Sequence, residues 1–499
     1  GGGGPTDEML ERARRLGSLP GMPSMGWDQP EAFFDRLASV SDKLPVYKGE
    51  CYLEYHRGTF TTHSNLKASF RGLERAMQTA EAVAAATGKR WDMETSWKRL
   101  IFSQFHDYIP GSSVWDVYME GLPELDRHAA EQLATATTQL SGKGEACVFN
   151  PHAQALNTWV ICPESGESVY VSLPPLSGTS IAVAKAEAPA GVKVDGSTVS
   201  NGLASFTLDE NGWIESLTTD GLEMPLTDPL GQLMLYPDRA AFFEPWDIDR
   251  HVLSMGEACN APATVKPVES GARAGFAVTR KVGKASEATV TYMLEAGSPL
   301  VHVEVDIDWH ESECLLKLLF PTDFLATNAR FGIPYGSVLR PQVNSGMVAE
   351  AMWEVPFNRY LAVFDEGESE GMFVVSESKY GASARDGTVG ISLVRSPRVT
   401  GNEAHGSAWP PHLTRLEIES IYSDQGQQTV RLAVGRYAAD LPRASQPAAL
   451  ADTLFTPPVV YTGSSIAPVI ESLKGGDTLV PCWVKPSEDG WVLRLHEVA

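Results

Sequence analysis

The chain has 499 residues, of which 43% are hydrophobic and 21% charged, a composition typical of a globular protein with roughly three domains. Sixty-three acidic residues against 40 basic ones give a net charge of −23 at pH 7, and no run of basic residues occurs. Nucleic acid and anionic membrane surfaces are bound through clustered Lys and Arg, so the charge argues against both as partners and favours solubility.

Helical patterns fill the first 140 residues. Thr6 is a candidate N-cap and Gly17 a stop signal for the first helix, Pro30 stands at a first helical position, and Gly88 follows a long amphipathic segment. The predicted helices cover residues 5–17, 28–40, 63–88, 93–107 and 112–140. Those after residue 28 predict a small helical bundle.

The pattern changes to β-strands after residues 141–146. Short alternating runs follow, separated by Gly, Pro, Asn and Asp. Asn211 and Gly212 lie between two such runs and predict a hairpin with a type I′ turn. We therefore expect an α+β multidomain protein, in which a helical bundle is followed by large antiparallel β-sandwich domains with accessory β modules.

The cysteines indicate a reducing environment. They are widely spaced and form no CxxC pair, which favours reduced thiols in a cytoplasmic protein over a disulfide scaffold or a Cys-based zinc site. The six are Cys51, Cys147, Cys162, Cys259, Cys314 and Cys482. No signal peptide is recognisable, and no apolar run approaches the ~18 residues of a membrane span. We therefore expect a cytoplasmic protein.

The first candidate site is His106-Asp107, at the predicted end of helix 93–107 and just before Pro110-Gly111. A His binds zinc through a ring nitrogen, and a neighbouring carboxylate can coordinate the metal or accept hydrogen bonds from hydroxyls. Alternatively, His106 complements the helix dipole and Asp107 begins a turn. Spacing alone favours this simpler interpretation, because a zinc site needs several ligands and no HxxxH or HxH motif is present. The helix should be packed through an apolar face of Trp97, Leu100, Ile101 and Phe105.

Two further segments carry polar clusters. In residues 49–65, Tyr55 and Arg57 stand among acidic residues and histidines that suit a sugar ring, although a solvated loop explains them equally well. In residues 242–252, Asp247 and Asp249 would share one face of a strand and could bind a cation, but protection of an exposed strand edge is the favoured explanation. No phosphate loop, nucleophile elbow or distinct pair of catalytic carboxylates stands out.

Several stretches together resemble the bacterial branch of the glycoside hydrolase family 38 α-mannosidases, in matching order and across essentially the whole chain. They are GGGGPTDEMLERARRL, GECYLEYHRGTFTTHSNLK, FSQFHDYIPGSSVWDVY, FNPHAQAL with WDIDRH, and two C-terminal segments, ESKYGASARDGTVGISLVRSP and LKGGDTLVPCWVKPSEDGWVLRLHE. The resemblance implies a catalytic (β/α) barrel, a helical bundle and β-sandwich domains. It also implies a zinc-dependent, retaining exo-α-mannosidase that acts on terminal α-mannosides.

The resemblance assigns roles to residues of this chain. His106 matches the family's zinc-ligand histidine on the helical domain, Asp107 matches the residue that contacts bound mannose, and Tyr55 and Arg57 are expected in the wall of the site. One zinc ion is implied. Its other ligands, the Asp nucleophile and the acid/base would precede Gly1, so we expect an incomplete metal site, no catalytic residue in this chain, and no activity of the chain alone.

The expected division has four parts: the end of the catalytic barrel in 1–24, the helical bundle in 25–140, the large β-sandwich region in 141–445, and a small, truncated C-terminal β segment in 446–499. The implied partner is a mannose-containing oligosaccharide, and a homodimer is compatible with the sequence. A non-catalytic carbohydrate-binding or interaction protein built from the same parts is the main alternative. A glycosidase of another sugar class on this scaffold is a third.

Overall fold

The computed structural model describes residues 4–241, 244–398, 422–476 and 478–498. It divides into two compact units, Gly1–Tyr52 and Leu53–Ala499. The first unit contains α1 (Asp7–Leu16), α2 (Pro30–Ala38) and the 3₁₀ turn η1 (Ser41–Lys43). As predicted, Thr6 caps α1 by accepting a hydrogen bond from Met9 N at 3.3 Å, and Gly17 follows its last turn.

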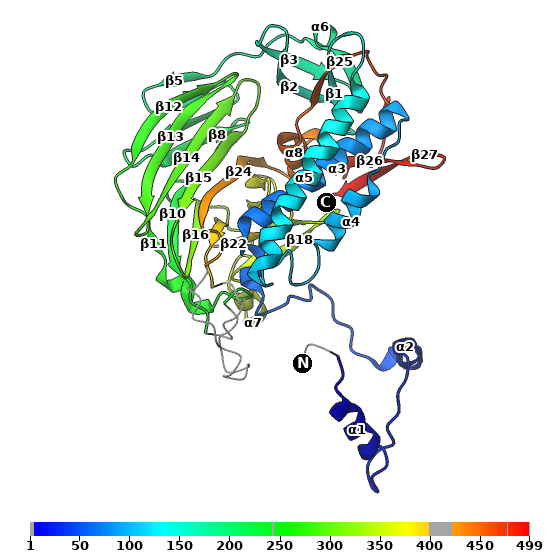
Figure 1. The fold of residues 1–499 in the computed structure, drawn as a ribbon. Helices are drawn as coiled ribbons and strands as arrows, with labels where there is room; N and C mark the ends of the chain where they lie inside the picture. Colours follow the sequence, from blue (N-terminus) through cyan, green and yellow to red (C-terminus); the bar gives the residue numbers. More distant parts are fainter. Residues whose placement is uncertain (1–3, 242–243, 399–421, 477, 499) are drawn as a thin grey trace. The chain divides into compact units, whose positions relative to one another are not determined.

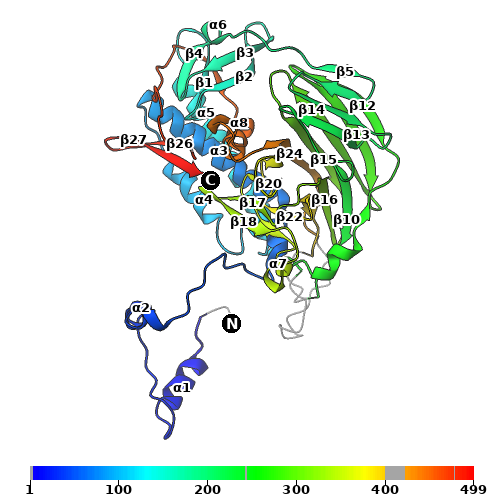
Figure 2. The same ribbon diagram turned by 180° about the vertical axis from the view of Figure 1, so that it is seen from behind.

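The second unit begins with helices that pack around one apolar cluster (Figure 1, Figure 2). They are α3 (Ser64–Thr87), α4 (Glu94–Phe102) and α5 (Trp115–Leu140), and the 3₁₀ turn η2 (Arg57–Phe60) precedes them. Leu73 and Met77 of α3 are fully buried in this cluster with Leu100 of α4 and Leu125 of α5. The prediction for the end of α3 is confirmed, since Gly88 follows it with a left-handed φ of 67°.

The prediction for the end of α4 is wrong. The helix ends at Phe102 rather than at Asp107. Ser103 Oγ donates to the Arg99 carbonyl at 2.9 Å, and the backbone bonds that follow join residues three apart, so the chain tightens into successive turns. These turns return Tyr108 to the apolar cluster, where it is 5% exposed. Burial of this ring, a tertiary effect, overrides the local helical pattern.

The apolar face predicted for this helix is only partly packed. Leu100 is 2% exposed and Trp97 is half-buried. Ile101 and Phe105 are 61% and 57% exposed. Only Trp97 and Leu100 of the predicted face therefore pack against the cluster. The position of the chain after Phe102 is determined by other contacts.

Antiparallel sheets form most of the remaining second unit within the described ranges. The first sheet has the order β25-β1-β4 (Val459–Gly463, Glu145–Asn150, Ser177–Ser180), and β2 and β3 form a hairpin (Leu156–Ile161, Ser168–Leu173). Strands β5 to β9 form the next sheet (Lys193–Asp195, Thr198–Ser200, Ala204–Leu208, Ile214–Thr219, Leu222–Glu223). Another has the order β11-β10-β16-β23-β22-β19 (Glu257–Ala258, Gln232–Pro237, Cys314–Pro321, Thr388–Arg395, Gly381–Arg385, Val355–Pro356).

The largest sheet has the order β12-β13-β14-β15-β24-β21-β20-β17-β18 (Thr264–Ser270, Arg273–Val282, Ser286–Glu295, Val301–Trp309, Gly426–Tyr437, Gly371–Ser376, Tyr360–Phe364, Asn328–Ile333, Gly336–Pro341). Strands β26 and β27 form a second hairpin (Leu479–Ser487, Gly490–Glu497). Short helices connect the strands: α6 (Ile181–Ala184), η3 (Arg250–Met255), α7 (Met347–Ala351), η5 (Arg443–Ser445) and α8 (Pro447–Phe455).

Buried aromatic residues join the largest sheet to its neighbours. Tyr292 of β14 is 1% exposed; its hydroxyl donates to the Gly231 carbonyl at 3.3 Å, just before β10. Its ring also lies against Phe206 of β7, with centroids 6.3 Å apart. The fold class is confirmed as α+β and multidomain, with helices followed by antiparallel sheets. The limits 1–24, 25–140, 141–445 and 446–499 stay predictions.

The predicted hairpin at Asn211-Gly212 forms with a different turn. Strands β7 and β8 pair as expected. Asp209 Oδ1 accepts hydrogen bonds from the backbone N of Asn211 and Trp213, both at 2.9 Å. Only Gly212 has a positive φ, 79°, whereas a type I′ turn needs positive φ at both central residues. The type I′ prediction is wrong because the Asp209 side chain caps the loop.

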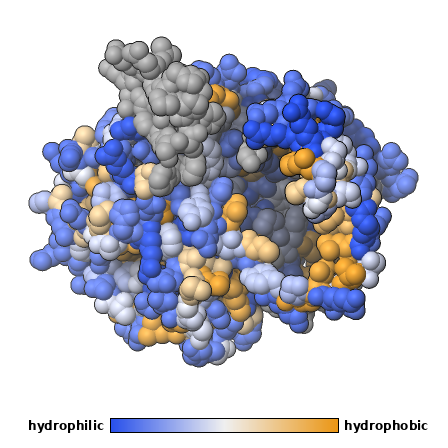
Figure 3. Space-filling model, turned by 90° about the horizontal axis from the view of Figure 1, so that it is seen from below, coloured by the Kyte–Doolittle hydropathy of each residue, from blue (hydrophilic) through white to orange (hydrophobic). Residues whose placement is uncertain are grey.

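The face of the molecule in Figure 3 is mainly hydrophilic, with hydrophobic residues in separate patches. This distribution agrees with the acidic composition of the chain. Among the described residues, no helix has the length and apolar character needed to cross a membrane.

Candidate active-site loop

The His–Asp loop, residues 103–114, joins α4 to α5 and carries the first candidate pair. The side chain of His106 is 76% exposed, and its Nε2 lies 3.4 Å from Asp107 Oδ2. Asp107 is more constrained, because its Oδ1 accepts a hydrogen bond from Ser112 Oγ at 2.9 Å and its carbonyl accepts one from the Tyr118 hydroxyl at 3.1 Å. The loop therefore presents a ring nitrogen and a carboxylate side by side at the surface.

Buried side chains hold the backbone of this loop. The Tyr118 hydroxyl also accepts a hydrogen bond from Ser113 N at 2.6 Å, and burial raises the pKa of Tyr118, so the phenol stays neutral. Lys67 of α3 donates to the Ile109 carbonyl at 2.8 Å and to the Thr62 carbonyl. Burial lowers the pKa of Lys67 to about 7. The loop backbone is thus fixed by groups that lie beneath it.

Part of the second candidate segment, residues 53–63, packs directly against the His–Asp loop. We call this part the arginine loop. Gly111 has a φ of 84°, and a Cβ there would lie 2.7 Å from the Thr62 carbonyl oxygen. His63 stacks on Tyr118 with ring centroids 3.9 Å apart, and burial lowers the pKa of His63 to about 3, so its ring is neutral. The structure therefore brings together two of the segments that sequence analysis singled out separately.

Arg57 lies in the interior, whereas Tyr55 lies on the surface. Arg57 is 2% exposed, and its Nη1 is 3.2 Å from Asp247 Oδ1. Its Nε and Nη2 donate to the Ala351 carbonyl at 3.1 and 2.9 Å, and its guanidinium carbon lies 3.5 Å from the Trp353 ring centroid. Tyr55 is 68% exposed with a φ of 63°. That both residues contact sugar stays a prediction.

Asp247 and Asp249 do not share the face of a strand. Residues 244–249 form turns and irregular backbone, and residues 242 and 243 lie outside the described part of the chain. Asp247 is 5% exposed and pairs with Arg57, while Asp249 Oδ2 accepts a hydrogen bond from Ala241 N at 2.9 Å. The strand prediction is wrong because these long-range and local contacts, not a β ladder, fix the backbone.

Arg395 of β23, which no sequence motif singled out, links these segments. Its side chain is fully buried and pairs with Asp238. Its Nη1 donates to Thr62 Oγ1 at 3.0 Å, and its Nη2 donates to the Asp247 carbonyl at 2.5 Å. A basic residue within an alternating strand carries no local signal of such a role. Through Arg395, the arginine loop and the WDIDRH segment share one buried network.

The residues that the structure describes do not form a zinc site by themselves. Among the described residues, no group of three or more His, Cys, Asp or Glu side chains is arranged to hold a metal. His106 and Asp107 offer one nitrogen and one carboxylate, fewer donors than the tetrahedral set that holds zinc. These two residues could contribute only part of a metal site.

Two family models match segments of this chain. Residues 54–141 match the family described as "Alpha mannosidase middle domain", and residues 199–400 match "Glycosyl hydrolases family 38 C-terminal domain". The chain belongs to glycoside hydrolase family 38 and contains its α-mannosidase middle domain and its C-terminal domain.

Several curated proteins are similar to most or all of this chain. The chain is 27% identical to "Alpha-mannosidase 2C1" of Homo sapiens over 546 residues, which covers 100% of this chain and 50% of that protein. It is 25% identical to "Alpha-mannosidase" of Saccharomyces cerevisiae, covering 87% of this chain and 42% of the relative. The chain thus spans about half the length of the curated relatives it matches. A solved α-mannosidase from Enterococcus faecalis shares the fold, with a TM-score of 0.70, 15% identity, and coverage of 93% and 66% of the two chains.

Proposed function

We propose that this chain forms the middle and C-terminal part of a zinc-dependent, retaining exo-α-mannosidase that removes terminal mannose from oligosaccharides. The observation that carries the proposal is the His–Asp loop, in which buried side chains fix the backbone beneath the adjacent His106 and Asp107. The matched domains and the relatives named α-mannosidase support it. In this proposal the nucleophile, the acid/base and the other zinc ligands belong to a barrel domain outside these 499 residues.

Each residue of the pair has its own task in the proposal. Zinc supplies Lewis-acid chemistry when bound. His106 provides one ring nitrogen for the metal. Asp107 accepts a hydrogen bond from a mannose hydroxyl through Oδ2, since Ser112 already occupies Oδ1. Tyr55 contributes an aromatic wall, whereas Arg57 holds the arginine loop in place and reaches sugar only if that loop opens.

The first test is the intact mass of the protein purified from its natural host. The proposal expects a mass above 54.1 kDa by about one barrel domain, ~250 residues. A natural mass near 54.1 kDa would instead favour the non-catalytic carbohydrate-binding protein.

The second test compares variants of the natural protein. His106→Ala should lower both the zinc content and the hydrolysis of an aryl α-mannoside, and Asp107→Asn should raise KM while zinc is retained. His310→Ala is the matched control, because His310 also pairs with a nearby carboxylate, Asp308 at 2.9 Å, on the surface. The isolated 499-residue chain should neither retain stoichiometric zinc nor cleave the substrate. Chelator-sensitive hydrolysis by that chain alone would contradict the proposed division of the site.

We also infer a cytoplasmic location. All six cysteines are free, and free thiols persist in a reducing compartment. Disulfide mapping of the natural protein tests this inference, and a disulfide between any two of them would count against it.

A further inference from the structure

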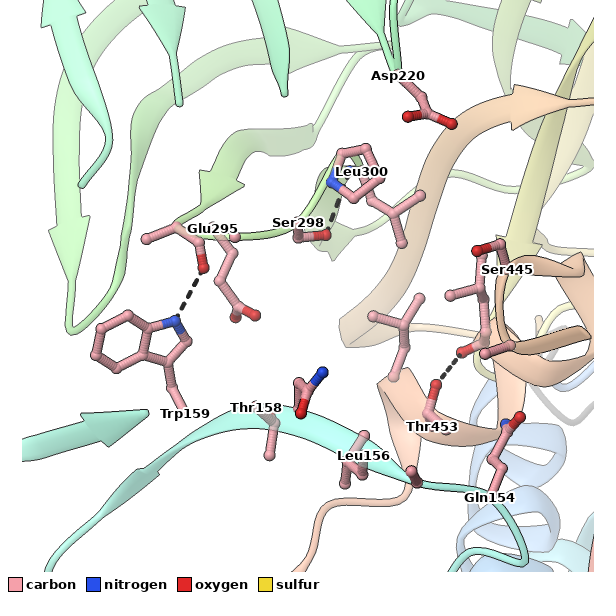
Figure 4. A pocket seen from close by; sticks show the side chains of 18 of the residues that line it. Gln154, Leu156, Thr158, Trp159, Asp220, Glu295, Ser298, Leu300, Ser445 and Thr453 are labelled. Atoms are coloured by element: carbon pink, nitrogen blue, oxygen red, sulfur yellow. Dashed lines mark hydrogen bonds between the residues drawn. The ribbon is translucent and has the colours of Figure 1, made fainter. Parts of the chain in front are cut away.

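A cavity lies between the β2–β3 hairpin, the turn from β14 to β15 and the segment around α8 (Figure 4). We call it the hairpin cavity. Its volume is about 480 Å³, within the range of ~300–1,000 Å³ typical of small-molecule sites. Figure 4 shows Trp159 and Thr158 on the hairpin side, Glu295 and Ser298 on the turn, and Thr453 on α8. Secondary-structure elements from three regions of the sequence therefore surround one space.

Two aromatic rings form the hairpin wall of the cavity. Trp159 and Tyr170 face each other across β2 and β3, with ring centroids 5.2 Å apart and a tilt of 52°. Trp159 Nε1 donates to the Ala296 carbonyl at 2.9 Å, which fixes the orientation of the indole. Because its polar edge is bonded and the side chain is only half-buried, the indole can offer an apolar surface to a ligand.

The charges around the cavity are largely paired. Arg273 Nε lies 2.6 Å from a Glu295 oxygen. Arg436 makes two hydrogen bonds to Glu370, at 2.6 and 2.7 Å, and its Nη1 lies 3.7 Å from Asp220. An anionic ligand would have to compete with these carboxylates for the guanidinium groups. A neutral ligand would meet no such competition.

Polar groups with spare hydrogen-bonding capacity also line the cavity. Gln154 Oε1 is buried and has no hydrogen-bond partner within the described residues, a state that costs roughly 1–3 kcal/mol unless a ligand or water satisfies it. Asp220 is 52% exposed at the rim and can accept hydrogen bonds. Ser298 Oγ accepts one from Leu300 N at 3.3 Å and still has its own hydrogen to donate. The cavity therefore combines an aromatic surface with acceptors and neutral hydroxyls.

We propose that the hairpin cavity binds a neutral saccharide, with one sugar ring against Trp159 and Tyr170 and its hydroxyls on Gln154, Asp220 and Ser298. A sugar ring has an apolar face of C–H groups and a rim of hydroxyls, which matches an aromatic surface beside hydrogen-bonding polar groups. This inference does not depend on the proposed catalysis, because it uses none of the residues of the His–Asp loop.

The test uses the 499-residue chain and saturation-transfer NMR with methyl α-mannopyranoside, methyl β-glucopyranoside and inorganic phosphate as probes. At least one methyl glycoside should bind, and phosphate should not compete with it. Trp159→Ala should weaken that binding at least about tenfold through loss of the aromatic contact. Asp220→Asn should weaken it severalfold while the turn is kept, since Asn tolerates the positive φ of 48° at this position.

Two control variants locate the bound sugar. Trp491→Ala removes another half-exposed tryptophan from the other hairpin, β26–β27, and should leave binding unchanged. His106→Ala alters the His–Asp loop and should also leave it unchanged. The proposal would be overturned if neither methyl glycoside bound the chain, or if phosphate competed with a bound glycoside. It would also be overturned if His106→Ala lost glycoside binding while Asp220→Asn retained it. Asp220→Asn keeps the test valid if Trp159→Ala does not fold.

Discussion

Replacement of Arg57 by Met should open the arginine loop, because the buried guanidinium pairs with a carboxylate and donates hydrogen bonds to a backbone carbonyl. Asp247 is 7% exposed at its side chain and lies 3.2 Å from Arg57 Nη1, and the Ala351 carbonyl receives two hydrogen bonds from Arg57. In Arg57→Met the carboxylate stays buried without that cation. Removal of one partner from such a pair costs about 3–5 kcal/mol.

Hydrogen exchange followed by mass spectrometry measures the opening of the arginine loop locally, in peptides from that loop and from the segment around Asp247. The chain has two compact units, so one global unfolding curve would mix separate transitions. Protection of peptides within residues 53–63 and 244–255 should fall by roughly a hundredfold or more, as ~3 kcal/mol requires. Asp247→Asn in the Arg57→Met background should restore part of it, because the buried charge is removed.

The matched control is Arg431→Met. The side chain of Arg431 is 54% exposed, so its ion pair with Glu377 should contribute at most ~1 kcal/mol to stability. Unchanged protection in Arg57→Met would refute the structural role. Loss of mannoside binding in that variant with full protection would show instead that Arg57 contacts the sugar.

Three further outcomes follow from the same network. Tyr118→Phe should lower protection of the His–Asp loop by about 0.5–1.5 kcal/mol, measured by hydrogen exchange, because the partly buried backbone N–H of Ser113 loses its acceptor. Gly111→Ala should open the same loop by at least ~1 kcal/mol, since φ is 84° and the new Cβ would meet the Thr62 carbonyl; unchanged exchange would show that the loops separate freely. The pKa of Lys67 is about 7 in the folded protein, because burial disfavours its charge, so above that pH the unfolded state binds more protons. The hydrogen-exchange protection of the His–Asp loop in the wild type relative to Lys67→Met, corrected for the intrinsic exchange rate at each pH, should therefore rise from about pH 6.5 to about pH 9. A difference that does not change with pH would contradict the assigned titration.

Local chemistry explains which elements could be predicted from the sequence. The start of α1 at Thr6 and the end of α3 at Gly88 depend on side chains and backbone within a few residues, so their patterns sufficed. The end of α4 depends on burial of Tyr108 in a cluster built by α3 and α5, which no local pattern contains. The turn type predicted at Asn211-Gly212 was wrong for a related reason, because the Asp209 side chain accepts hydrogen bonds from the loop backbone.

The candidate site shows the same limit more strongly. Arg57 and Asp247 are 190 positions apart, and their pairing follows from the fold rather than from either motif. Both segments carry recognisable sequence patterns, but those patterns predicted a strand around Asp247 and a place in the wall of the site for Arg57. Arg395 had no signal at all, although it joins the two segments from β23.

The support beneath the His–Asp loop is the strongest structural reason to give His106 and Asp107 a role. A surface connection between helices is normally held loosely, because few of its groups are buried. Here the buried Tyr118 and Lys67 both bind the loop backbone, and Gly111 allows close approach of the arginine loop. None of these contacts uses the His106 ring, which stays exposed at 76%. Rigid backbone beneath free side chains is what a preorganised ligand site requires, since a donor that is already in position need not be ordered when its ligand binds.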